Sequence, residues 1–179
     1  MRALANLIDR VNVATGKGLA WFALVIVLIQ FAIVLMRYVF GVGSIWMQEL
    51  IVYLHAFLFM LAAAYTLSME GHVRVDIFYR EAAPRTKAKI NFFGSLLLLI
   101  PVCLLIVYVS WGYVSNSWAI LEGSQETSGI QARFLLKSAI IGFAIQMGLQ
   151  GVVVMVRSWY ALQGDEIELD RLQQTGGSI

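Results

Sequence analysis

Few side chains within the long apolar stretches of this chain are able to carry chemistry. His55 is the one His, Asp, Glu, Lys or Arg side chain well inside such a stretch, where an ionisable residue marks a candidate functional site. An imidazole there can ligate haem or relay a proton, but a membrane b-type haem usually needs a second histidine facing the first. The other histidine, His72, lies roughly 25 Å away along the same expected helix, by the rise per residue. One chain cannot supply the pair, so we expect His55 to form a structural hydrogen bond.

Two charged residues lie near the boundaries of the first two apolar stretches. Glu49 opens the second stretch, where the helix dipole stabilises a carboxylate, so a capping role is expected. Arg37 ends the first stretch on the same side and is placed to pair with Glu49 across a short loop.

The fourth apolar stretch carries two amides one turn apart, Gln146 and Gln150. Ala144 and Gly148 add a pair of small residues at a spacing of four, which lets helix backbones approach, and amides hydrogen-bond across such contacts. We interpret both glutamines, and Gln30 in the first stretch, as helix–helix contacts.

The composition narrows the function classes. The chain of 179 residues is 60% hydrophobic and 13% charged, against roughly 25% charged in ordinary soluble domains. Its net charge of +2 is too small to suggest nucleic-acid binding. The sequence has no HExxH, CxxC, Walker or GxSxG motif, so we expect no catalytic residue, no metal site, no cofactor and no enzyme activity.

Four uncharged stretches must position these residues: 18–36, 50–69, 92–114 and 138–156. Each is 19 to 23 residues long, and about 20 helical residues cross the roughly 30 Å hydrocarbon core of a bilayer. The fold class expected is an all-α integral membrane protein with four transmembrane helices. Residues 1–164 would form this single domain in the lipid bilayer, and residues 165–179 an acidic, polar and flexible tail.

The basic residues predict the orientation. Ten of the thirteen Lys and Arg residues lie in the N-terminal segment, in the connection between the second and third stretches, or in the C-terminal tail. Since positively charged loops stay in the cytoplasm, both termini are expected there. The connections 37–49 and 115–137 would then face outward.

Three further segments carry structural expectations. Leu4, Leu7 and Val11 recur at helical spacing, which predicts either an amphipathic helix at the membrane surface or an early extension of the first helix. The connection 70–89 mixes charged and apolar residues and is expected to lie along the membrane or a partner, with Pro84 breaking or beginning a helix. Pro101 predicts a kink in the third helix.

Two motifs then point to a family. The first runs from Arg37 to Gly41 as RYVFG, followed by Trp46 and Glu49; the second is AAY at 63–65 followed by GHVRVD at 71–76. Together they resemble the small membrane subunit of tripartite ATP-independent periplasmic (TRAP) transporters over about residues 20–157. The outward connection also resembles a run seen in a subset of these subunits, through Glu122, Ser124, Glu126, Ser128, Gly129 and Lys137. Residues 68–70 depart from the family, which often has arginine there.

The resemblance implies a division of labour in a bacterial inner membrane. A periplasmic binding protein captures an organic acid, a large permease subunit moves it inward on a sodium or other ion gradient, and the small subunit packs beside the permease as scaffold. On this basis Arg37, Trp46 and Glu49 would shape the periplasmic ends of the first two helices. The cytoplasmic turn after the second helix would be shaped by Gly71, His72, Arg74 and Asp76. A role limited to capping helices and fixing topology is equally compatible with both motifs.

Three other functions stay open at this point. A small proton-coupled exporter also has four helices but needs a membrane-embedded carboxylate, which the first stretch lacks. A haem-binding anchor of an oxidoreductase would rest on His55. A scaffold or assembly factor unrelated to transport can be separated only by its partner.

Overall fold

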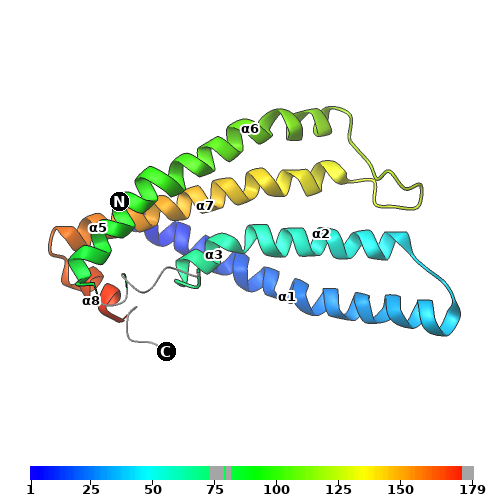
Figure 1. Ribbon diagram of the computed structural model, residues 1–179, viewed down its shortest axis with the longest axis horizontal. Coiled ribbons are helices and arrows are strands. Elements are labelled where there is room, and N and C mark those ends of the chain that lie inside the picture. Colours follow the sequence, from blue (N-terminus) through cyan, green and yellow to red (C-terminus); the bar gives the residue numbers. More distant parts are fainter. Residues whose placement is uncertain (73–78, 80–81, 175–179) are drawn as a thin grey trace.

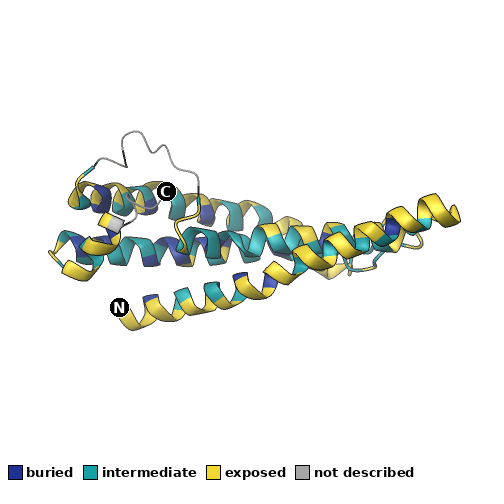
Figure 2. Cartoon of the chain, turned by 90° about the horizontal axis from the view of Figure 1, so that it is seen from below, coloured by how far each residue is buried: buried dark blue, intermediate teal, exposed yellow. Residues whose placement is uncertain are grey.

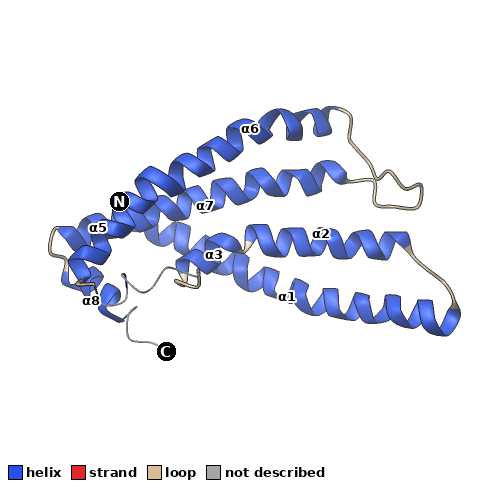
Figure 3. Ribbon diagram, in the orientation of Figure 1, coloured by secondary structure: helices blue, strands red, loops and turns tan. Residues whose placement is uncertain are grey.

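The structure is a computed structural model that describes residues 1–72, 79 and 82–174. The described residues form helices joined by loops (Figure 3), and four helical segments are long and apolar enough to cross a membrane, which confirms the expected fold class. The first is α1 (Arg2–Phe40), and the second joins α2 (Ile45–Leu61) to α3 (Ala63–Ser68). The third joins α5 (Pro84–Gly94), the π-helical turn η1 (Ser95–Leu99) and α6 (Ile100–Ala119). The fourth is α7 (Arg133–Leu162), and the short helix α8 (Glu166–Gln174) follows it.

The long helices form two antiparallel hairpins that lie side by side (Figure 1). One hairpin pairs α1 with α2, the other pairs α6 with α7, and α7 contacts both α1 and α2. We call the end that holds the N-terminus, α5 and α8 the terminal end, and the end that holds the connections 41–44 and 120–132 the loop end.

The first helix is much longer than the apolar stretch that predicted it. It begins at Arg2 rather than at residue 18, so the early extension, and not a separate surface helix, is correct. Gly16 is buried here because α3 crosses closely: an added Cβ would lie 2.5 Å from Cβ of Tyr65. The helix ends at Phe40 and is capped by Gly41, whose left-handed φ of 67° is readily adopted by glycine. Its 39 residues span roughly 58 Å, well beyond the hydrocarbon core.

The second span begins earlier than expected and is interrupted. Ser44 caps α2 by accepting a hydrogen bond from the backbone of Met47 at 3.4 Å, so Ser44 and not Glu49 is the capping residue. Ala62 separates α2 from α3, and the Thr66 hydroxyl donates to the Ala62 carbonyl at 3.1 Å.

The third span contains both prolines. Pro84 begins α5, as the sequence predicted. The kink expected at Pro101 stays a prediction, but a π-helical turn, η1, ends two residues before this proline. Proline has no N–H to donate to the preceding turn, and a π-helical turn is wider than a regular α-helical turn. Both features interrupt the regular hydrogen-bond pattern of the α-helix.

The C-terminal segment differs from the flexible tail that we expected. Residues Glu166–Gln174 form α8, which packs on α5 and α7. Leu172 is buried against Ala88 and Ala161, and Lys87 Nζ donates to the Leu172 carbonyl at 3.2 Å. The Asp165 carboxylate accepts from the backbone of Glu168 at 3.3 Å, which caps the helix. Acidic residues therefore coexist with a buried apolar face on this segment.

Buried residues lie at intervals along the helices, and much of the helix surface is exposed (Figure 2). Many buried residues are small, such as Ala64, Ala144 and Ala161, and many large apolar residues are exposed. One core cluster joins Ala64, Cys103 and Met147 from three different helices. Small residues at helix contacts and large apolar residues outside suit a bundle surrounded by lipid.

Candidate functional site

The loop end holds a cluster of polar contacts centred on Glu49. The Ser124 hydroxyl donates to Oε1 of Glu49, and the backbone N–H of Ile130 donates to Oε2 at 2.6 Å. One turn along α2, the Tyr53 hydroxyl donates to the Ile130 carbonyl at 3.5 Å. The connection 120–132 is thereby held against α2.

A second set of contacts holds the same connection to α6 and α7. Lys137 on α7 forms an ion pair with Glu122, and its ammonium lies 3.9 Å from the ring centroid of Tyr113 on α6. The hydrogen bond from Lys137 holds the pKa of the Glu122 carboxyl below its ordinary value. Both side chains are mostly shielded, with 17% of Lys137 and 26% of Glu122 exposed. We call Glu49, Glu122, Ser124, Ile130 and Lys137 the loop-end cluster.

Gly129 fits between the partners of this cluster. A Cβ at this position would lie 2.6 Å from Oε2 of Glu49, closer than real Cβ contacts come. The side chains of Glu126 and Ser128, by contrast, are exposed. Some residues of the run that resembles a subset of TRAP subunits therefore hold the connection 120–132 in place, and others are exposed on its surface.

The structure does not bring Arg37 and Glu49 together. Both carboxylate oxygens of Glu49 bond to the connection 120–132, and Arg37 lies exposed on the last turn of α1. Trp46 is half exposed on the first turn of α2. The contact between Glu49 and the loop was missed because the two sequence motifs that contain these residues are 75 to 81 positions apart.

The terminal end holds a second polar chain that joins α1 to α7. Asn12 Nδ2 donates to Oε1 of Gln150 at 2.8 Å, and Gln150 Nε2 donates to Oδ1 of Asp9 at 2.9 Å. Arg157 forms an ion pair with the other oxygen of Asp9. Asn12 and Gln150 are only 3% and 1% exposed. We call these four residues the terminal-end cluster.

The two glutamines of α7 differ in how they are satisfied. Gln150 is bonded on both sides, whereas Oε1 of Gln146 is buried without a hydrogen-bond partner in the described part of the chain. Sequence reasoning found the glutamines but missed Asp9, Asn12 and Arg157. The signal for Asp9 and Asn12 was the polar face of α1 opposite Leu4, Leu7 and Val11, which the structure turns toward α7.

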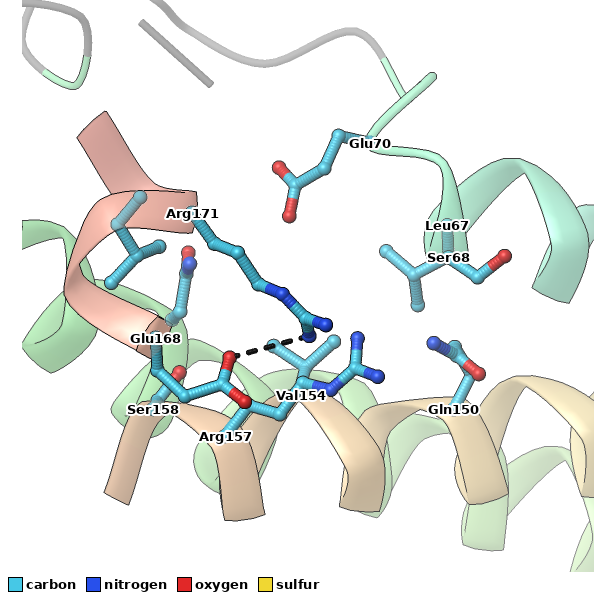
Figure 4. Close-up of a pocket in the computed structure, with 11 residues that line it drawn as sticks. Leu67, Ser68, Glu70, Gln150, Val154, Arg157, Ser158, Glu168 and Arg171 are labelled. Carbon is cyan, nitrogen blue, oxygen red and sulfur yellow. Dashed lines mark hydrogen bonds and ion pairs between the residues drawn. The ribbon is translucent and has the colours of Figure 1, made fainter. Parts of the chain in front are cut away.

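A small pocket of about 70 Å³ adjoins the terminal-end cluster (Figure 4). Gln150 and Arg157 line it from α7, and Glu168 and Arg171 line it from α8. Nη1 of Arg171 lies 3.5 Å from Oε2 of Glu168. At the same end of the bundle, Arg2 forms an ion pair with Asp165, and its guanidinium carbon lies 4.5 Å from the ring centroid of Tyr160.

The second motif lies beside this end and is only partly described. The Gly71 backbone donates to the Thr66 carbonyl at 2.8 Å and closes α3, while Nε2 of His72 is buried without a partner among the described residues. Arg74 and Asp76 lie outside the described residues, as do the other residues of 73–78 and 80–81 in the segment 70–89 that was expected along the membrane or a partner.

The two clusters consist of mutually paired acids, bases and amides. Their hydrogen bonds and ion pairs join segments that are far apart in sequence. The clusters therefore stabilise the arrangement of the helices and of the connection 120–132. Within residues 1–72, 79 and 82–174, no three His, Cys, Asp or Glu side chains are grouped so as to hold a metal ion.

Comparison with known proteins gives one family. The family described as "Tripartite ATP-independent periplasmic transporters, DctQ component" matches residues 26–162, more than half of the chain. No curated protein and no solved structure matches.

Proposed function

The chain belongs to the DctQ component family of tripartite ATP-independent periplasmic transporters, and from this premise we propose that it acts as the scaffold subunit beside the large permease. It is a multi-pass component of the inner membrane, in a type of transporter that also has a large permease and a periplasmic binding protein. In the proposed role it carries no catalytic step. It supports uptake of an organic acid that the binding protein delivers and an ion gradient drives.

The observation that carries the scaffold role is the pairing of polar groups at both ends of the bundle. The loop-end cluster ties the connection 120–132 to three helices, and the terminal-end cluster ties α1 to α7. Between them lies a core of small residues such as Ala64 and Ala144. A bundle fixed at both ends suits a fixed partner surface better than a moving transport element.

We further propose that the terminal end lies in the cytoplasm and the loop end in the periplasm. The distribution of Lys and Arg supports this orientation. The exposed side chains of 125–128, together with those of Arg37 and Trp46, would then be on the side of the binding protein. Arg74 and Asp76, in the turn expected in the cytoplasm, would serve assembly, and intact assembly and uptake in both Arg74→Ala and Asp76→Ala would contradict that role.

The test is purification of the tagged chain from its native membrane in mild detergent, with mass spectrometry of the proteins that accompany it. We expect a large multi-helix permease in roughly equal amount. Deletion of the gene should abolish binding-protein-dependent uptake of the organic acid, and the wild-type gene should restore it. A chain that purifies alone, or with a redox enzyme, would contradict the proposal.

A further inference from the structure

Two polar side chains are exposed on the α1–α2 hairpin inside the apolar part of the bundle. Gln30 lies on α1 and His55 on α2, and both are exposed. From Gln30 to the end of α1 at Phe40, and from the start of α2 at Ile45 to His55, is ten residues in each case. Both therefore lie about 15 Å along their helices from the same short connection, at a similar depth in the membrane.

Neither side chain is satisfied by the described part of this chain. Within it, neither the Gln30 amide nor the His55 imidazole forms a hydrogen bond, so the structural hydrogen bond expected for His55 is not present there. The imidazole only stacks on Phe59, with ring centroids 6.3 Å apart. Their exposed neighbours are apolar: Val34 lies one turn from Gln30, and Phe59 is 76% exposed. An amide and an imidazole among lipid tails would lose the hydrogen bonds that water gives them.

The second hairpin presents a different surface. At comparable positions α6 exposes Leu104, Leu105 and Val109, and Ser110 donates to the carbonyl of Ile106 within its own helix. Tyr108 is 82% exposed, and its side chain is mostly apolar with one polar atom at the tip, which suits lipid better than an amide or an imidazole does. The exposed side of α6 is therefore suited to acyl chains.

We propose that the α1–α2 hairpin is the face that packs against transmembrane helices of the large permease subunit. Gln30 and His55 hydrogen-bond there to polar side chains or open backbone carbonyls of that subunit. This inference rests on the proposed function, since the family supplies a separate large membrane subunit as partner. The terminal-end and loop-end clusters, whose polar groups bond to one another, have no such demand for a partner.

The inference is tested by site-specific photo-crosslinking in the full complex, co-expressed with its large subunit. The photoreactive amino acid benzoylphenylalanine replaces Val34 on α1 or Phe59 on α2. Each position has a control on α6 with a similar native side chain, Val109 for the valine and Tyr108 for the aromatic residue. These positions leave Gln30 and His55 in place.

We expect adducts with the large subunit from Val34 and Phe59 and none from Val109 or Tyr108. If the large subunit co-purifies but crosslinks only to α6, or to none of the four positions, the hairpin assignment is overturned while the proposed function stands. Adducts between two copies of this chain also overturn it. If no large subunit co-purifies, the proposed function itself fails.

A second measurement addresses the polar groups directly. Gln30→Leu and His55→Leu should each lower retention of the large subunit about threefold in a detergent titration, as expected for one interhelical hydrogen bond in a membrane. The double variant should lower it roughly tenfold if the two bonds are independent. Gln48→Leu, an exposed amide on the first turn of α2, is the control and should change nothing. Unchanged retention in the double variant would overturn the proposed hydrogen bonds.

Discussion

At the scale of single residues, Gly129 shows how closely the loop-end cluster is packed. A methyl group at this position would push against the Glu49 carboxylate, so Gly129→Ala should release the connection 120–132 from α2. We expect faster hydrogen exchange of the Ile130 amide, which otherwise donates to Glu49. Gly43→Ala, in the other connection of the loop end, has open space around it and should leave exchange unchanged. Equal effects of the two substitutions would contradict this packing.

Glu122 gives the same loop a dependence on pH. The Lys137 hydrogen bond lowers the pKa of Glu122 when the loop is docked, so docking is favoured above the ordinary pKa of about 4.3. This contribution is lost as the pH falls through the lowered value. A spin label at Gln125→Cys, in a Cys103→Ser background, should keep constant mobility from neutral pH to about 4.3 and gain mobility only below it.

The matched variant for this experiment is Glu122→Gln. It removes the ion pair with Lys137 at every pH but leaves the contacts of Glu49 with the loop intact. Its label should already be more mobile at neutral pH. A midpoint above the ordinary carboxyl pKa in the wild-type protein would show that the docked loop does not favour the ionised form.

At the scale of helices, the terminal-end cluster joins α1 to α7 through Gln150. Gln150→Leu leaves the buried amide of Asn12 without an acceptor and one oxygen of Asp9 without a donor. We expect a loss of about 1–3 kcal/mol in the free energy of unfolding, the usual cost of unsatisfied buried groups. Thermal unfolding of the purified chain in detergent measures it.

Gln146→Leu, one turn away on the same helix, is the control. Oε1 of Gln146 is already buried without a partner in the described part of the chain, so its removal should be neutral or stabilising. The same glutamine-to-leucine change should therefore lower the stability at position 150 but not at position 146. If both variants lost equal stability, the hydrogen bonds of Gln150 would not be the cause.

The helix α8 depends on one buried side chain. Leu172→Ala removes the contact with Ala88 and Ala161, at an expected cost of about 2 kcal/mol, the low end for leucine truncations. The loss should appear as local opening of α8, measured by hydrogen exchange or proteolysis, and not as unfolding of the bundle. Ile167→Ala on the same helix removes a side chain that is 64% exposed and should have little effect.

The sequence predicted the spans better than the contacts between them, for physical reasons. An apolar stretch of about 20 residues by itself indicates a membrane-spanning helix, so the four spans could be predicted without knowing which helices they contact. The bonds from Ser124 and Ile130 to Glu49 join residues 75 and 81 positions apart, and no periodicity encodes them. The helix α8 was mistaken for a tail because its acids obscure the spacing of Leu169 and Leu172, which places both on one face.

The sequence also did not predict which side of α1 is buried. Asp9 and Asn12 lie opposite an apolar stripe, which in a soluble protein would turn the polar side to water. Here the stripe of Leu4, Leu7 and Val11 is exposed and the polar residues face α7. Which side of an amphipathic helix is buried depends on what surrounds the molecule, and in a membrane protein the polar side can be the inner one.

At the scale of the whole molecule, the orientation in the membrane follows from the charges and can be measured. Cys103 is the single cysteine, so a Cys103→Ser chain accepts one reporter thiol at a time. Asn6 at the terminal end and Gln125 at the loop end are both exposed. With a membrane-impermeant maleimide and a permeabilised outer membrane, Gln125→Cys should react and Asn6→Cys should react only after the inner membrane is disrupted.

Leu28→Cys supplies the control for depth in this experiment. Leu28 is 57% exposed but lies inside the apolar stretch 18–36, where a thiol is shielded from water and ionises poorly. It should react in neither condition, which separates exposure to lipid from exposure to water. The reverse pattern for Asn6 and Gln125 would place the positively charged connections outside. The exposed residues 125–128 would then lie on the side opposite the binding protein, so this labelling also decides whether the loop-end cluster is able to position them for contact with it.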